Sequence, residues 1–447
     1  MAEVRVIPDS SAPSSPSPPV PGRPLLLLLA VTCGVTVANV YFPQAVSPLI
    51  ADGLHVPSSS AALVVTCAQL GYAAGIFLLV PLGDRMRPRS LVTTLLLITC
   101  AGLLLAATAT RLPVLAAAGA LVGLTTVVPQ ILIPMAAGLS SPQRRGAVTG
   151  TLLSGLIGGI LLARTFSGVL GQWLGWRAPY LAAAALALLL APVMAVALPR
   201  TAPSTDQPYP KLLAAPVRLL RTEPLLRRSC QYQVLVFAAF SAAWTALALF
   251  VTGPRYHLGT PAVGVIALVG AAGMLATPIA GRRTDRDGPD AVSLVCLTGT
   301  VTAGVLLMAG NLGGPVGLVG LAAGMLLLDV AMQSGQVANQ ARIFALRPEA
   351  RARLNTAYMT CAFLGGSAGS WLGVRAYSAF GWDGVCALVT VLAGLALLRH
   401  VLRDRPGRVS TANTAQRTSE PSGDTAPQTS PPSGGTDRGE VEAGRGR

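Results

Sequence analysis

Two ionisable residues lie deep inside long apolar segments of the sequence. Arg164 stands in GILLARTFSG and Asp329 in MLLLDVAMQ. A charged side chain is costly in hydrocarbon, so such residues are functional candidates. Desolvation raises the proton affinity of a carboxylate and a nearby arginine lowers it, which suits a carrier of a coupling proton. We predict that Asp329 and Arg164 form an intramembrane charge pair that couples transport to protons; a permanent salt bridge that fixes packing is the alternative.

Amide and aromatic side chains are predicted to line a substrate cavity. Three of them, Gln333, Gln336 and Gln340, are spaced at i, i+3 and i+7 and share one helical face. Together they favour a polar or amphipathic solute, although each amide could equally serve helix packing. The predicted lining residues are Asn39, Tyr41, Gln44, Gln130, Trp244, Gln333, Gln336 and Gln340.

Two short basic loops occur in the same place relative to their flanking apolar segments. VPLGDRMRPRS begins at Val80, and GRRTDRDG begins at Gly281. An aspartate at a helix end can accept bonds from the exposed amides of another helix's N-terminus, while arginines hold phosphates or carboxylates. The alternative is an arginine-rich anchor that only sets topology. The residues singled out in these two loops are Asp84, Arg85, Arg89, Gly281, Asp285, Arg286 and Gly288.

The composition indicates a polytopic membrane protein. Of the 447 residues, 52% are hydrophobic and 11% are charged, whereas about a quarter of an ordinary soluble domain is charged. The net charge of +15 resides largely in short loops between apolar runs and in the tails, so we expect lipid rather than nucleic acid as the partner.

The apolar runs define an all-α membrane protein with twelve transmembrane helices. A span needs about 20 predominantly apolar residues. The predicted spans are 24–48, 59–82, 90–109, 113–138, 147–170, 178–198, 231–252, 262–280, 291–309, 315–339, 355–379 and 384–401.

These spans divide into two six-helix bundles. The predicted parts are a disordered tail at 1–23, a first bundle at 24–198, a linker at 199–230, a second bundle at 231–403 and a disordered tail at 404–447. In the linker, leucines alternate with basic residues from Lys211 to Arg228, which is typical of a helix on an anionic lipid surface; Pro216 and Pro224 should break it. A partner-binding segment is the alternative.

Arginine and lysine set the orientation, because short basic loops stay in the cytoplasm. Alternate loops are rich in these residues, and the opposite set holds only Arg111, Arg177 and Arg255. We therefore expect both termini to be cytoplasmic.

The two bundles are predicted to be parallel repeats. At a constant offset Gln130 falls opposite Gln336, Pro142 opposite Pro348, and Gly175-Trp176 opposite Gly381-Trp382. Two six-helix halves related by an axis along the membrane normal occur in one large transporter fold, with substrate bound between them near the midplane.

The chain resembles the major facilitator superfamily, whose signature after spans two and eight is G-x-x-x-D-R-x-G-R-[RK]. Gly281, Asp285, Arg286 and Gly288 fit the second copy; the first keeps Asp84, Arg85 and Arg89 but has Val80, Arg87 and Pro88 at three signature positions. ANVYFPQAVSPLI, AQLGYAAG and VPLGDR are similar to the bacterial branch of drug:proton antiporters and sugar exporters. In that fold spans five and ten lie near each other, and the resemblance implies that the residues singled out in the two basic loops form a conformational latch that favours one face of alternating access.

The resemblance implies a monomeric secondary transporter of the bacterial cytoplasmic membrane that exports a small molecule in exchange for protons and needs no cofactor but the proton gradient. Proton-coupled uptake is the alternative. A membrane-embedded enzyme is a remote one, because Asp329 is the one carboxylate predicted deep in the membrane and His55, His257 and His400 lie in or beside predicted loops. The sequence has no GxxxxGK[ST] or HExxH motif and no CxxC spacing, so we predict no ATP or metal site.

Overall fold

A computed structural model describes residues 22–141, 144–199, 205–347 and 350–403. These ranges exclude residues 1–21 of the predicted first tail, residues 200–204 of the predicted linker, all of the predicted tail at 404–447, and the aligned Pro142 and Pro348. The described chain is helical, in the order α1 (Arg23–Ala38), α2 (Phe42–Leu54), α3 (Ser58–Ala61), α4 (Leu63–Leu78), α5 (Leu82–Arg85), α6 (Pro88–Thr108), α7 (Leu112–Thr125), α8 (Val128–Gly138), α9 (Arg145–Leu174), α10 (Ala178–Ala197), α11 (Tyr209–Thr222), α12 (Pro224–Thr252), α13 (Thr260–Ala271), the 3₁₀ turn η1 (Ala272–Leu275), α14 (Ala276–Asp287), α15 (Pro289–Leu307), η2 (Met308–Leu312), α16 (Gly314–Phe344) and α17 (Arg351–Arg403).

The protein is an all-α membrane protein. Within the described ranges, ten helical segments are long and apolar enough to cross a bilayer. The predicted count of twelve differs in two places. The predicted span 262–280 is divided by η1, and α17 contains the last two predicted spans, with a non-helical break at Gly381. The twelve-span count stays a prediction.

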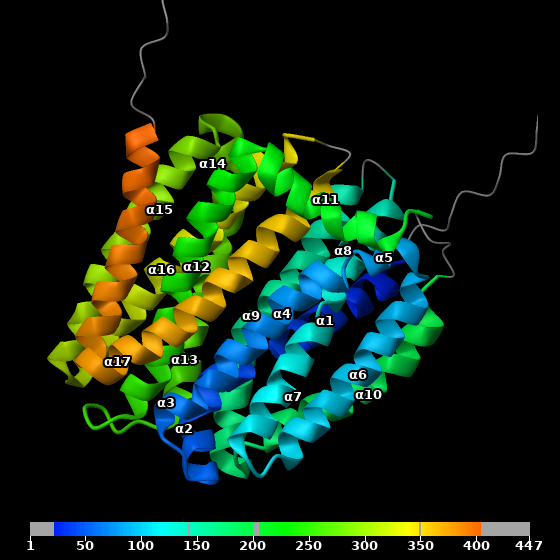
Figure 1. Ribbon diagram of the computed structural model, residues 1–447. Helices are drawn as coiled ribbons and strands as arrows, with labels where there is room; N and C mark the ends of the chain where they lie inside the picture. Colours follow the sequence, from blue (N-terminus) through cyan, green and yellow to red (C-terminus); the bar gives the residue numbers. More distant parts are fainter. Residues whose placement is uncertain (1–21, 142–143, 200–204, 348–349, 404–447) are drawn as a thin grey trace, which may run out of the picture. The chain divides into compact units, whose positions relative to one another are not determined.

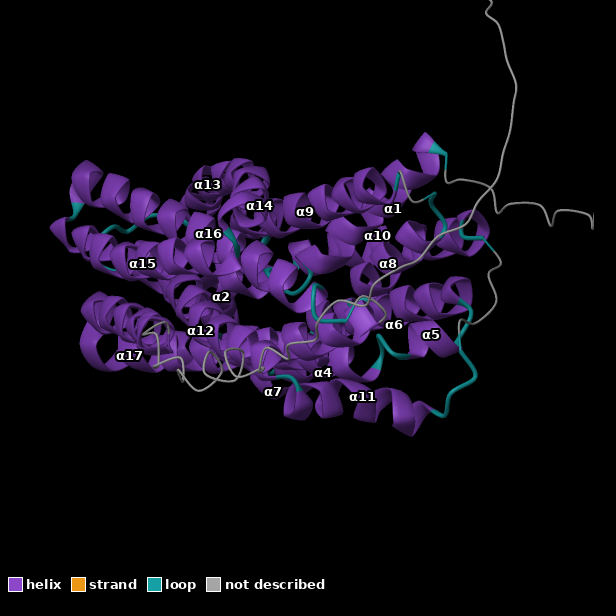
Figure 2. Cartoon of the chain, turned by 90° about the horizontal axis from the view of Figure 1, so that it is seen from above, coloured by secondary structure: helices purple, strands orange, loops and turns teal. Residues whose placement is uncertain are grey.

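Within residues 23–401 the helices form two groups. The first helix group consists of helices that precede the linker helix α11, and the second consists of helices that follow it. Figures 1 and 2 show α6, α8 and α10 on the right and α15, α16 and α17 on the left. Helices α5, α11 and α14 lie toward the upper end in Figure 1. We call this end the linker face, because it carries the linker helix α11.

Small residues bring the backbones of neighbouring helices together inside the first group. Gly155 and Gly159 of α9 lie against Ala30 and Gly34 of α1 so closely that a Cβ at either glycine would meet backbone atoms. Close approach at small residues is a common way for membrane helices to associate, since lipid supplies no hydrophobic drive between them. Packing thus explains Gly155 and Gly159.

The aligned Gly-Trp pairs have equivalent local structures. Gly175 has φ 84° and Gly381 has φ 63°, both in the region that favours glycine. The tryptophans that follow, Trp176 and Trp382, are both buried. Each glycine therefore allows the chain to turn between two spans, as expected of a sequence repeat.

The linker differs from its prediction. Pro216 does not break the helix, because α11 runs through it from Tyr209 to Thr222; Pro224 instead begins α12. Helix α11 also does not turn its whole apolar side to lipid. Leu219 is buried and packs with Leu226 of α12 and Ile343 of α16.

Candidate functional site

A cavity of about 770 Å³ runs from the linker face into the middle of the bundle. Its mouth is lined by Asp84 of α5, Leu212 of α11 and Arg353 of α17. Its deep end reaches Arg164 of α9 and Asp329 of α16, so both helix groups contribute to its walls. The volume falls within the roughly 300–1,000 Å³ typical of small-molecule sites.

The structure brings five of the eight predicted lining residues to this cavity. They are Tyr41, Gln130, Gln333, Gln336 and Gln340. The other three, Asn39, Gln44 and Trp244, do not line it; they are buried behind the wall. The prediction placed them wrongly because their apolar surroundings cannot show which side of a buried helix faces the cavity.

Arg164 is completely buried at the deep end of the cavity. Its Nε donates to Gln44 Oε1 at 2.8 Å. Its guanidinium lies over Trp244, with 4.0 Å from Cζ to the ring centroid, and 5.0 Å from the ring of Tyr41. Cation–π attraction partly replaces the lost hydration. Nη1 and Nη2 nevertheless have no hydrogen-bond partner.

Asp329 is also buried, with an exposed fraction of 2%. Its Oδ2 has no hydrogen-bond partner. A side chain at Gly270 of α13 would collide with this oxygen, and a Cβ at Gly273 would lie 3.6 Å from Asp329 Cβ. The two glycines thus make room for a carboxyl group beside α13.

Asp329 and Arg164 do not form the predicted ion pair. They interact electrostatically, but the unpartnered state of Asp329 Oδ2 and of both Arg164 Nη atoms shows that they make no direct contact. The guanidinium instead donates to Gln44 and lies over the ring of Trp244. The coupling role and the alternative of a fixed packing role both stay predictions.

Hydrogen-bonded amides connect the two helix groups across the cavity wall. Asn355 Nδ2 of α17 donates to Gln130 Oε1 of α8 at 3.4 Å, and Gln340 Nε2 donates to Asn355 Oδ1 at 3.4 Å. Gln336 Oε1 accepts from Gln233 Nε2 at 3.4 Å. Sequence reasoning missed Gln233 and Asn355, although both are amides at the start of predicted spans.

The predicted latch residues occupy different environments. Asp84 lines the cavity mouth, whereas Arg85, Asp285 and Arg286 are exposed. In the second loop the paired carboxylate is that of Asp287, which contacts Arg283 and Arg286.

The remaining latch residues give no new contact. Arg89 is half-buried, and no atom lies within 4 Å of a Cβ built at Gly281. Gly288 has φ 84° and allows the turn into α15. The latch stays a prediction.

A buried charge cluster near the linker face was not predicted. Asp290 Oδ1 accepts from Arg228 Nη2 at 2.7 Å and from Arg342 Nη2 at 2.6 Å. His400, expected in or beside a loop, is instead buried with its Nδ1 3.3 Å from Arg228 Nη2 and 3.2 Å from the Tyr232 hydroxyl. Its position near the end of the last apolar run could not reveal this burial.

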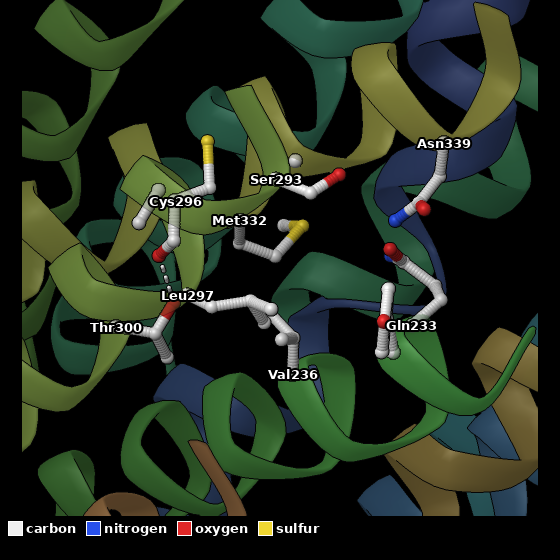
Figure 3. Close-up of a pocket in the computed structure, with 11 residues that line it drawn as sticks. Gln233, Val236, Ser293, Cys296, Leu297, Thr300, Met332 and Asn339 are labelled. Carbon is white, nitrogen blue, oxygen red and sulfur yellow. Dashed lines mark hydrogen bonds between the residues drawn. The ribbon is translucent and has the colours of Figure 1, made fainter. Parts of the chain in front are cut away.

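A second cavity lies between α12, α15 and α16 (Figure 3). Gln233 and Asn339 point toward it from α12 and α16, and Ser293 and Thr300 line it from α15. Its volume is about 10 Å³, which is close to the smallest space that holds one water. This cavity is too small for a solute.

The helix groups meet at the end opposite the linker face through a seam between α9 and α13. Thr260 Oγ1 donates to Gly168 O at 2.8 Å, and Thr165 Oγ1 donates to Gly264 O at 2.9 Å. A Cβ at Gly264 would lie 2.8 Å from Thr165 Cα. The cavity is therefore open toward the linker face while this seam is closed.

A membrane bundle with a central cavity that reaches one face and is sealed at the other is the architecture of a solute transporter. The model of the Major Facilitator Superfamily matches residues 26–325 and 256–433, and the chain belongs to this family.

Named relatives and a solved structure agree with this assignment. Uncharacterized transporter YgaY of Escherichia coli O157:H7 is 37% identical over 374 residues, which cover 84% of this chain and 94% of that protein. Probable transporter SCO4007 of Streptomyces coelicolor is 35% identical over 367 residues, covering 82% and 84% respectively. A crystal structure of nucleoside transporter NupG superposes with a TM-score of 0.68 at 14% identity, covering 85% of this chain and all of that one, and shows the fold.

The close packing of the seam allows us to predict the effect of a single methyl group added at Gly264. Gly264→Ala should force α9 and α13 apart, because the new Cβ meets backbone rather than a flexible side chain; such overpacking costs about 1–3 kcal/mol. Spin labels at exposed Arg111 and Leu312, in a background without native cysteines, should report a longer distance. Gly158→Ala is the matched control, since nothing lies within 4 Å of its Cβ. Equal distance distributions in both variants would show that the seam tolerates the methyl.

The charge cluster predicts a stability effect. Asp290→Asn should lower the melting temperature, because it leaves the buried guanidinium groups of Arg228 and Arg342 without their shared carboxylate. The cost should be below the roughly 3–5 kcal/mol of breaking a fully buried pair, since 52% of the Asp290 side chain is exposed. Asp287→Asn, which removes pairs with exposed arginines, is the control. Equal melting temperatures for the two variants in detergent would contradict the prediction.

Proposed function

We propose that this chain is a proton-coupled secondary transporter that exports a small polar or amphipathic molecule, drug-like or sugar-like, in exchange for protons. Asp329 carries the coupling proton. The observation that supports this role is a buried carboxyl with an unpartnered oxygen at the deep end of the cavity. Intramembrane carboxylates of this kind commonly belong to proton or ion pathways.

Transport proceeds by alternating access. In the conformation described, solute enters from the linker face, which the arginine distribution assigns to the cytoplasm of a bacterial cell. Opening the α9–α13 seam while the mouth closes exposes Asp329 and the solute to the other side. The residues around Asp84 and Asp285 act as the latch that biases this exchange. The protein works as a monomer and needs no cofactor beyond the proton gradient.

Export by proton exchange agrees with the resemblance of the first spans to drug:proton antiporters and sugar exporters. Cotransport of solute and proton is the second candidate. It is favoured by one observation, the two unpartnered Nη atoms of Arg164 at the same end of the cavity as Asp329. A solute that binds Arg164 would share the cavity with the proton site.

Asp329→Asn tests the proton role without a known solute. The wild type should change its population of seam-closed molecules with pH, because protonation alters the charge inside the bundle. The variant should remain folded in the membrane and lose this response. The distance between labels at Arg111 and Leu312, recorded over a range of pH values, gives the measurement.

Asp287→Asn serves as the control, because it removes an exposed carboxylate outside the cavity. Once a growth screen against antibiotics, dyes and sugars has identified a solute, Asp329→Asn should also abolish its transport by an imposed pH gradient in proteoliposomes. An Asn variant with an unchanged pH response and unchanged gradient-driven flux would remove Asp329 from the mechanism.

A further inference from the structure

Arg164 is a buried cation with its two terminal nitrogens unsatisfied. Its exposed fraction is 0%, and of its donors only Nε has a partner, Gln44 Oε1. Burying a charge without full compensation is unfavourable, and each buried donor that lacks a partner adds to this cost. The cost of these unsatisfied donors is recovered when a solute with a hydrogen-bond acceptor binds at the end of the cavity.

The contacts of Arg164 leave its two terminal nitrogens without hydrogen-bond partners at the deep end of the cavity. Trp244 lies 4.0 Å below the guanidinium, and Tyr41 and Phe240 lie at 5.0 Å and 5.8 Å. Aromatic stacking uses the flat face of a guanidinium and does not consume its N–H groups. Nη1 and Nη2 thus remain as a pair of parallel donors, a geometry that matches a carboxylate.

The charges around the cavity favour an anion. Three arginines line it, Arg164, Arg351 and Arg353, against two carboxylates, Asp84 and Asp329. The difference is one positive charge with all groups ionised, and two when Asp329 carries a proton. A cleft lined with an excess of one sign concentrates solutes of the opposite sign.

The walls between mouth and deep end are mainly apolar. Phe237, Phe240 and Phe363 contribute aromatic rings, and Leu156 and Ile157 contribute aliphatic surface. A solute that fills this cavity must have an apolar body. The single fixed cation at the deep end selects the charge at one end of that body.

We propose that the solute is a small organic monoanion, an apolar body with one carboxylate or comparable acidic group, bound through Nη1 and Nη2 of Arg164. This proposal rests on the proposed proton-coupled transport and names the solute class of the same cavity. Gln44 and Trp244 are positioning residues, because they hold the guanidinium without lining the cavity.

Anion and proton should bind together. The titratable groups that act electrostatically on Asp329 are Arg164 from α9 and Tyr41 from the α1–α2 turn, while Trp244 of α12 and Gly270 of α13 carry no charge. A bound anion neutralises Arg164 and repels the carboxylate, so it favours protonated Asp329. By reciprocity the proton favours the anion. Of the two senses of coupling proposed above, an anion therefore favours cotransport.

The test uses the purified full chain and matched trios of probes with the same apolar body. One trio is biphenyl-4-carboxylate, biphenyl-4-carboxamide and 4-phenylbenzylammonium, and further trios vary the body. The wild type should bind at least one carboxylate about tenfold more tightly than its amide or ammonium partner, as expected for a charge-assisted pair. Calorimetric titration and the rise in melting temperature measure this preference.

Substitutions assign the preference to Arg164. Arg164→Gln should abolish the preference for the carboxylate. Arg164→Lys keeps the charge but loses the pair of parallel N–H donors, so it should retain a reduced preference. The Lys variant also controls for a folding defect in the Gln variant. Arg375→Gln removes an exposed arginine outside the cavity and should leave the preference unchanged. Asp329→Asn should bind the carboxylate with an affinity that no longer falls as pH rises.

The outcomes separate this proposal from the proposed function. If no carboxylate in any trio binds better than its amide, or if the preference survives Arg164→Gln, the anion proposal is wrong. Gradient-driven flux of an amide or ammonium probe in proteoliposomes would overturn the anion proposal and leave proton-coupled transport standing. Arg164-dependent carboxylate binding without any gradient-driven flux would overturn proton-coupled transport and leave the anion proposal standing.

Discussion

The arrangement of this bundle depends on keeping two opposite charges buried beside one cavity without letting them touch. In a medium of low dielectric constant a direct contact would be strong and difficult to break. Gln44 and the ring of Trp244 hold Arg164 on α9, while Gly270 leaves space for Asp329 beside α13. Under the proposed function, this separation would leave both groups able to respond to a proton or a solute, which a closed salt bridge would prevent.

The two ends of the bundle are held by different interactions, and this difference makes a change of conformation feasible. The seam between α9 and α13 relies on glycine contacts and two threonine hydroxyls that donate to carbonyls. The cavity wall relies on long hydrogen bonds between side-chain amides, such as that between Asn355 and Gln130. The seam bonds and the Asn355–Gln130 bond cross between the helix groups, and among the described residues these bonds join uncharged groups. Each can therefore be exchanged for water or for another polar group at modest cost.

Sequence reasoning found the elements and the depth of the charged residues, because both follow from the length of the apolar runs. The helical spacing of Gln333, Gln336 and Gln340 also predicted a shared face that lines the cavity. Sequence reasoning failed where the direction in which a side chain faces depends on packing between helices. Trp244 is turned behind the cavity wall by its stacking on a cation from α9. Asp290 meets Arg228 and Arg342 although these residues come from three helices distant in sequence, so no local pattern reveals the cluster.

The linker helix α11 contacts the cavity mouth and both helix groups. Leu212 and Pro216 line the cavity mouth. At its start the Tyr209 hydroxyl donates to Leu78 O of α4 at 2.6 Å, and at its end Glu223 pairs with Arg347 at 2.7 Å. The helix is therefore attached to the first helix group at one end and to the second at the other. Any movement that closes the mouth must carry α11 with it or break one of these attachments, so the linker adds its own free energy to the balance between the two conformations.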